Sequence, residues 1–178
     1  MKIVNIPNIL TSIRILLVPV FVMMLIYGRH KTALVVFIIA TITDAFDGMI
    51  ARRTGQKTEL GAFLDPLADK AILMTSFIIF AYLKWIPKWL AVIVISRDLI
   101  VLFGWILLYI IYGKTKVEVV YSGKIAIATQ FILIAYTLAY INFHNLLPKV
   151  TLEVFIAVGC ITAFSGIQYI YRGLTQNT

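Results

Sequence analysis

The strongest constraint on this sequence is a succession of long apolar runs that nearly fills the chain. An α-helix needs about 20 mostly apolar residues, at 1.5 Å each, to cross roughly 30 Å of hydrocarbon. Six runs have this length, with ends placed to about three residues: 9–27, 32–50, 60–83, 87–112, 124–142 and 150–171. The runs are continuous rather than alternating, which favours helices over the strands of a barrel.

These runs predict an all-α membrane protein, a bundle of six transmembrane helices with a polar cavity facing the cytoplasm. The connections are short, so residues 1–178 are expected to form a single transmembrane domain. Composition agrees, because 61% of the residues are hydrophobic and only 13% are charged, where a soluble domain would have near half and a quarter. The net charge of +8 suits anionic lipid or a phosphorylated substrate; nucleic acid is disfavoured because most of the surface must face lipid.

The distribution of basic residues predicts the orientation of the bundle. With six spans, both termini share one side with the second–third and fourth–fifth loops. That side carries eight Lys and Arg residues and the opposite loops carry five. The positive-inside rule therefore predicts a multi-pass protein of the cell (inner) membrane with both termini cytoplasmic.

Apart from charges in the first four residues of a span, eight charged residues fall inside the predicted spans. Each costs about 2.5 to 3.5 kcal/mol at a helix centre, so such residues are rarely retained without a partner or a function. The acidic ones are Asp44, Asp47, Asp65, Asp69 and Asp98, and the basic ones are Arg14, Lys70 and Arg97.

Four of the carboxylates form two pairs on neighbouring predicted helices. Asp44 and Asp47 are three residues apart and Asp65 and Asp69 are four apart, spacings that put each pair on one helical face. A short linker makes the helices antiparallel, so the four carboxylates converge below the cytoplasmic surface and need a cation. Oxygen ligands without His or Cys favour Mg²⁺, Mn²⁺ or Ca²⁺. The alternatives are helix caps paired with nearby basic residues, and a proton or cation transporter.

Two glycines and an arginine accompany these carboxylates. Gly48 and Gly61 leave space where a bulky group could approach, although close helix packing explains either one alone. Arg52 follows Gly48 by about one turn and suits a phosphate, although a cytoplasmic anchor is the simpler interpretation.

Together these residues read Asp44-x2-Asp47-Gly48-x2-Ala51-Arg52-x8-Gly61-x3-Asp65-x3-Asp69. This pattern of eight residues over 26 positions resembles the full signature of the CDP-alcohol phosphatidyltransferase family, and the six-span layout is similar as well. The opening segment 5–14, Asn-Ile-Pro-Asn-Ile-Leu-Thr-Ser-Ile-Arg, resembles the bacterial branch that uses glycerol 3-phosphate as acceptor.

The resemblance implies transfer of the phosphatidyl group of CDP-diacylglycerol to glycerol 3-phosphate, giving phosphatidylglycerophosphate and CMP in phospholipid biosynthesis. It implies a site for two metal ions, Mg²⁺ or Mn²⁺, with Asp44, Asp47, Asp65 and Asp69 as ligands. It also implies that Asp69 is the general base, a choice that the spacing alone leaves open. Homodimers are common in the family, so a homodimer is a further expectation.

The same resemblance implies the residues that bind CDP-diacylglycerol, whereas charge and position indicate those that bind the acceptor. The CDP-diacylglycerol site is expected to comprise Asn8, Thr11, Gly48, Arg52, Thr58 and Gly61. For the acceptor phosphate the candidates are the cations Arg97, Lys124 and Arg14. An Arg97 pair with Asp98 or Asp69, and a Lys124 that reaches the membrane surface, are the structural alternatives. A cardiolipin synthase, which uses phosphatidylglycerol as acceptor, is the functional alternative within the family.

Overall fold

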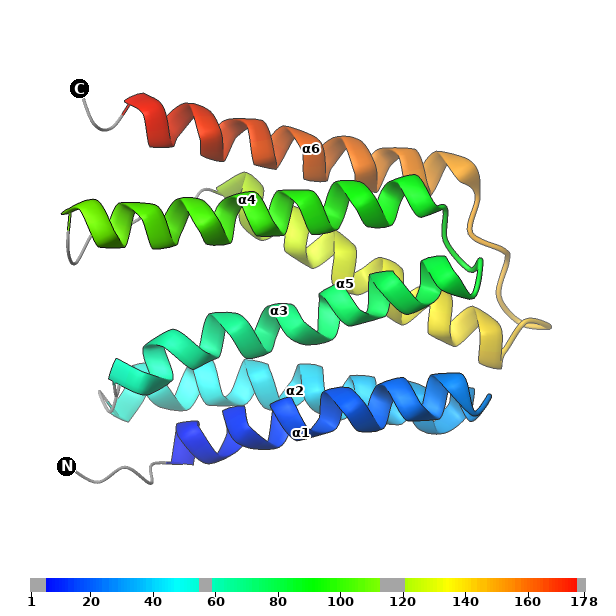
Figure 1. The fold of residues 1–178 in the computed structure, drawn as a ribbon. Helices are drawn as coiled ribbons and strands as arrows, with labels where there is room; N and C mark the ends of the chain where they lie inside the picture. The colour runs from blue at the N-terminus through cyan, green and yellow to red at the C-terminus, as the bar shows by residue number, and fades with distance from the viewer. Residues whose placement is uncertain (1–5, 55–58, 113–120, 176–178) are drawn as a thin grey trace. The chain divides into compact units, whose positions relative to one another are not determined.

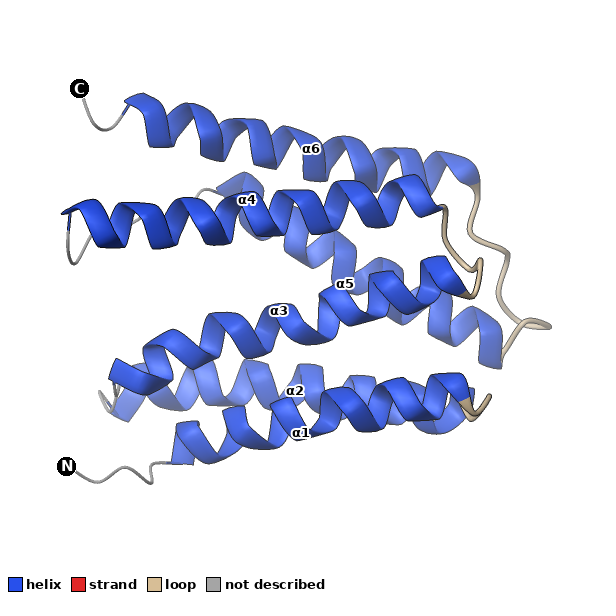
Figure 2. Cartoon of the chain, viewed as in Figure 1, coloured by secondary structure: helices blue, strands red, loops and turns tan. Residues whose placement is uncertain are grey.

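The computed structural model describes residues 6–54, 59–112 and 121–175, and these residues form six α-helices (Figure 1). Side chains are described for 13–43, 70–104, 106–107, 110 and 121–172. The helices are α1 (Ile6–Ile26), α2 (His30–Thr54), α3 (Glu59–Tyr82), α4 (Lys88–Tyr112), α5 (Tyr121–Asn142) and α6 (Leu152–Thr175). The prediction of six helices is confirmed, and the described chain contains no strand (Figure 2).

The helix ends differ from the prediction where the chain becomes polar. Helix α2 continues to Thr54 instead of ending near Ile50, and α6 continues to Thr175. Hydropathy locates only the apolar part of a helix, whereas Ala and Arg are good helix formers and extend it into the polar region. Arg52, predicted to lie in a loop, is therefore within α2.

The chain divides into two compact units, each described here by itself. The first unit is Met1–Ile79 with Ala135–Pro148, and the second is Phe80–Ile134 with Lys149–Thr178. The first thus contains α1, α2 and most of α3, and the second contains α4, most of α5 and α6.

The core of the first unit lies between α1 and α2, which run antiparallel (Figure 1). Phe21 and Phe37 are buried with ring centroids 5.9 Å apart. The end of α5 is attached by Asn142, whose Nδ2 donates to the carbonyl oxygen of His30 at 3.1 Å.

The turn after α1 requires a left-handed residue. Gly28 has φ 69°, its amide donates to the carbonyl of Leu25, and the amide of Arg29 donates to that of Met24. This Schellman pattern satisfies the last carbonyls of the helix. Lys84, with φ 61°, occupies the equivalent position after α3, where a glycine would be less strained.

In the second unit, α4 packs against α6 with side chains interlocking at a glycine. A Cβ atom on Gly159 would lie 2.8 Å from the Trp89 ring, so the two helices approach closely only because no side chain is present there. A buried hydrogen bond joins α5 to α6, from Gln130 Nε2 to Thr162 Oγ1 at 3.1 Å. Both of these side chains are fully buried.

Several polar side chains are buried in this structure, and many apolar side chains are exposed. Arg14, Arg97, Asp98 and Gln130 are buried, whereas many large apolar side chains on all six helices are exposed. A protein in water rarely exposes such a continuous apolar surface, and lipid accommodates it. Within the described residues, Tyr121–Asn142 and Leu152–Arg172 are long and apolar enough to cross a membrane. The chain is therefore a membrane protein.

The Gln130–Thr162 bond gives a test of this packing. Thr162→Val should lower the free energy of unfolding by about 0.5 to 1.5 kcal/mol, because the Gln130 amide loses its acceptor. Adding Gln130→Leu should recover part of the loss, since Gln130 Oε1 already lacks a hydrogen-bond partner among the described residues. Denaturant unfolding in mixed micelles measures both. If the changes in the free energy of unfolding caused by the two substitutions simply add in the double variant, the hydrogen bond contributes nothing.

Candidate active site

The four predicted metal ligands lie on two helices that meet at one end of the first unit. Asp44 and Asp47 are in α2, and Asp65 and Asp69 are in α3. The C-terminal end of α2 and the N-terminal end of α3 lie at the same end of the unit (Figure 1). At 1.5 Å per residue, all four positions are about 9 to 15 Å from those helix ends. The backbone thus brings them to a common level, while their side chains lie outside the described residues.

The predicted CDP-diacylglycerol residues that the structure describes come from α1, α2 and α3. Asn8 and Thr11 are in α1, Gly48 and Arg52 are in α2, and Gly61 is in α3. Their side chains, and the whole of Thr58, lie outside the described residues. Their roles therefore stay predictions.

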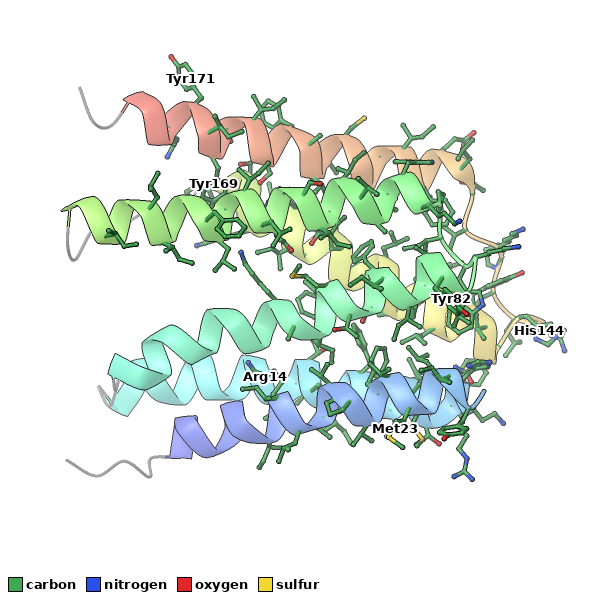
Figure 3. All side chains as sticks on the ribbon, viewed as in Figure 1. Arg14, Met23, Tyr82, His144, Tyr169 and Tyr171 are labelled. Carbon is green, nitrogen blue, oxygen red and sulfur yellow. The ribbon has the colours of Figure 1, made fainter. Side chains whose placement is uncertain are left out.

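Arg14 is the largest fully buried side chain of the first unit, with 1% of its surface exposed. It lies on the side of α1 that faces the other helices of the unit (Figure 3). It lies eight positions after the start of α1, about 12 Å along the helix axis from that end. All acidic residues of the first unit fall between positions 44 and 69, so a countercharge from its own unit comes from that segment.

A second group of polar residues surrounds Arg97 in the second unit. Arg97 is 3% exposed, and its Nη1 donates to Asp98 Oδ1 at 2.6 Å. Its Nη2 donates to Ser165 Oγ at 3.0 Å, and its Cζ lies 5.4 Å from the centroid of the Tyr169 ring. Neighbouring side chains one residue apart rarely face each other on a helix, so the Arg97 side chain is folded back by these contacts. The Arg97–Asp98 pair is the structural alternative that the sequence offered.

The start of α5 lies against this guanidinium. A Cβ atom on Gly123 would be 3.1 Å from Arg97 Nη2, so the absence of a side chain lets α5 approach it. Lys124 follows directly, is exposed, and its Nζ lies 5.4 Å from the centroid of the Tyr121 ring. The structure therefore brings two of the three predicted phosphate-binding residues, Arg97 and Lys124, to one region, while Arg14 belongs to the other unit.

Helix α6, to which the sequence pattern gave no role, supplies three residues that lie against Arg97. Ser165 and Tyr169 contact the guanidinium, and Gly166 lies against the Arg97 stem, where a Cβ would be 3.2 Å from Cγ. The signal available was the small polar pair Ser165-Gly166 within an apolar helix. Tyr171, two residues beyond Tyr169, points away from α4 and is exposed (Figure 3).

The fit of a metal depends on the chemistry of the donors. Where side chains are described, no three His, Cys, Asp or Glu residues gather, and the four aspartates lie outside that part. Four carboxylates at similar distances from the ends of α2 and α3 suit a hard divalent cation. His144 could also ligate a metal, but it is exposed in the connection between α5 and α6. It lies at the opposite end of its unit from the aspartates (Figure 3).

Comparison with known proteins shows which family this chain resembles. The profile of the CDP-alcohol phosphatidyltransferase family matches residues 4–165. A protein of Mycobacterium tuberculosis H37Rv named "Probable phosphatidylglycerophosphate synthase" is 34% identical, over 97% of this chain and 83% of its own length. Proteins of Escherichia coli K12 and Shigella flexneri named "CDP-diacylglycerol--glycerol-3-phosphate 3-phosphatidyltransferase" are each 31% identical over 93% of both chains.

Proposed function

Since this chain belongs to the CDP-alcohol phosphatidyltransferase family, we propose that it transfers the phosphatidyl group of CDP-diacylglycerol to glycerol 3-phosphate. The observation that carries the acceptor is the similarity over nearly the whole chain to relatives named for glycerol 3-phosphate. The products are phosphatidylglycerophosphate and CMP, so the enzyme acts in phospholipid biosynthesis.

The reaction exchanges one phosphorus–oxygen bond for another. The acceptor hydroxyl oxygen attacks the phosphorus that carries diacylglycerol, the bond to the CMP oxygen breaks, and CMP leaves. Asp69 accepts the hydroxyl proton. A base must lie within about 3 Å of that hydroxyl, and the family resemblance favours Asp69 among the four carboxylates.

Asp44, Asp47, Asp65 and Asp69 would hold the divalent metal, as two ions of Mg²⁺ or Mn²⁺. When bound, the metal neutralises the pyrophosphate and stabilises the charge that develops on leaving CMP. Two of these aspartates are in α2 and two are in α3. The CDP group would lie against Gly48 and Gly61, with Asn8, Thr11, Arg52 and Thr58 as its polar contacts.

The acceptor phosphate would bind at Arg97 and Lys124, with Arg14 as a third cation. A phosphate of nearly two negative charges loses much hydration below the membrane surface and needs fixed donors in return. Arg97 supports this role because it is buried and surrounded by polar groups. Lys124, directly after Gly123, adds an exposed cation.

The membrane arrangement proposed is six spans with both termini cytoplasmic and a polar cavity open to that side. Its support is the outward apolar surface of all six helices and the excess of basic residues on one side. The acyl chains of CDP-diacylglycerol remain in lipid, so the cavity needs a lateral opening. A homodimer is part of the proposal only by family resemblance.

An acceptor panel tests the function directly. Purified protein with CDP-diacylglycerol and Mg²⁺ or Mn²⁺ should release CMP with glycerol 3-phosphate, and exhaustive chelation should abolish this until metal is restored. Preference for phosphatidylglycerol would make the protein a cardiolipin synthase. Ion flux through reconstituted vesicles without CMP release would indicate a transporter instead.

Replacing the proposed base gives a second test. Asp69→Asn should lower turnover by at least about a hundredfold, the general scale of acid–base catalysis. CDP-diacylglycerol binding should be partly retained, because three carboxylates remain. Near-normal turnover in a folded Asp69→Asn protein would exclude Asp69 from this role.

Replacing the acceptor cations gives a third test. Arg97→Gln and Lys124→Gln should each raise the KM for glycerol 3-phosphate far more than the KM for CDP-diacylglycerol, because each contacts one substrate. Arg97→Gln also removes the positive charge next to the buried Asp98 carboxylate, which costs stability. Arg97→Lys keeps the charge without the forked geometry, and it should show the same selective rise in a stable protein. Unchanged acceptor KM values in all three variants would move the phosphate site elsewhere.

A further inference from the structure

Arg97 has hydrogen-bonding capacity that its contacts do not use. The guanidinium has five N–H donors, and the structure assigns one on Nη1 to Asp98 and one on Nη2 to Ser165. Its Nε is buried and has no hydrogen-bond partner among the described residues. A buried donor without a partner is costly, so the environment of Arg97 is incomplete without a polar ligand.

A further unpartnered atom belongs to the residue before Gly123. Ser122 Oγ is buried without a hydrogen-bond partner in the described chain. The first turn of α5 also has backbone N–H groups for which the helix itself provides no carbonyl acceptor. Amides at a helix start, a hydroxyl and a guanidinium are together the donors that a phosphate requires.

The position of the guanidinium is determined by groups from two other helices. From α6, Ser165 accepts a hydrogen bond from Nη2 and the Tyr169 ring lies beside Cζ. From α5, Gly123 leaves room for Nη2, and a Cβ there would also lie 2.9 Å from the Tyr169 ring and hydroxyl. Charge balance alone does not need these contacts, because Asp98 on α4 already supplies the countercharge.

We propose that Ser165, Tyr169 and Gly123 are positioning residues that hold the Arg97 guanidinium toward the phosphate of the acceptor, and so set the affinity for a phosphorylated alcohol. The proposal rests on the function proposed above. Arginine has high side-chain entropy, and a donor fork fixed before binding loses less of it when the phosphate arrives. Recognition of the acceptor then depends on the junction of α4, α5 and α6 as well as on the cation.

Kinetics of two variants that leave Arg97 and Asp98 intact test this role. Ser165→Ala removes the hydrogen bond to Nη2, and Gly123→Ala puts a methyl group where Nη2 and Tyr169 lie. Each should raise the KM for glycerol 3-phosphate by about fivefold or more, with the KM for CDP-diacylglycerol within about twofold of the original. Ser165→Thr keeps the hydroxyl and should restore most of the acceptor affinity.

Thr162→Val is the matched control. Thr162 is a fully buried hydroxyl on α6, one turn before Ser165, and it bonds Gln130 instead of Arg97. It should reduce stability without changing either KM. Ser165→Ala and Gly123→Ala with normal acceptor KM, or with both KM values raised alike, would overturn the proposal. If the original protein releases no CMP with glycerol 3-phosphate, the proposed function fails instead, and the two failures are thereby distinguished.

Discussion

The cost of an ionised side chain in hydrocarbon governs how this chain folds. Arg97 and Asp98 are both almost fully buried in a helix whose outer face is apolar, and either charge alone would cost several kcal/mol there. Their mutual contact at 2.6 Å makes the burial tolerable, and Ser165 satisfies a further donor. Helix α6 must therefore present its polar face to α4 and its apolar face to lipid.

The same constraint explains why small residues stand where the helices meet. Gly123 and Gly166 lie against the Arg97 side chain and Gly159 lies against Trp89, so a side chain at any of these positions would force its neighbours to shift. Helix association in membranes depends on such close packing and on interhelical hydrogen bonds, because apolar burial gains nothing against lipid. In the proposal, the residues that pack against Arg97 therefore both stabilise the second unit and hold the guanidinium in position for the acceptor phosphate.

In the proposed reaction, different residues bind the metal and the acceptor phosphate. The carboxylates that would bind metal are on α2 and α3, and Arg97 is on α4. A divalent metal would stabilise negative charge on the oxygens of the reacting phosphate and of CMP, whereas the acceptor phosphate takes no part in bond exchange and needs only binding. Separate groups for reacting and spectator phosphates let acceptor affinity vary without loss of the chemical step.

The sequence by itself determined the all-helical class, the number of helices, the family and the levels of the four aspartates, because each depends on local periodicity or on the spacing of residues along one or two helices. It also identified Arg97 and Lys124 as candidate phosphate-binding cations, with Asp98 or Asp69 as the alternative partner of Arg97. Only the tertiary structure showed the contact with Asp98 and the contribution of Ser165, Gly166 and Tyr169. These residues are about 70 positions from Arg97 in the chain, and no periodicity within one helix specifies which side of α6 faces α4. That choice is made when buried donors find acceptors across helices.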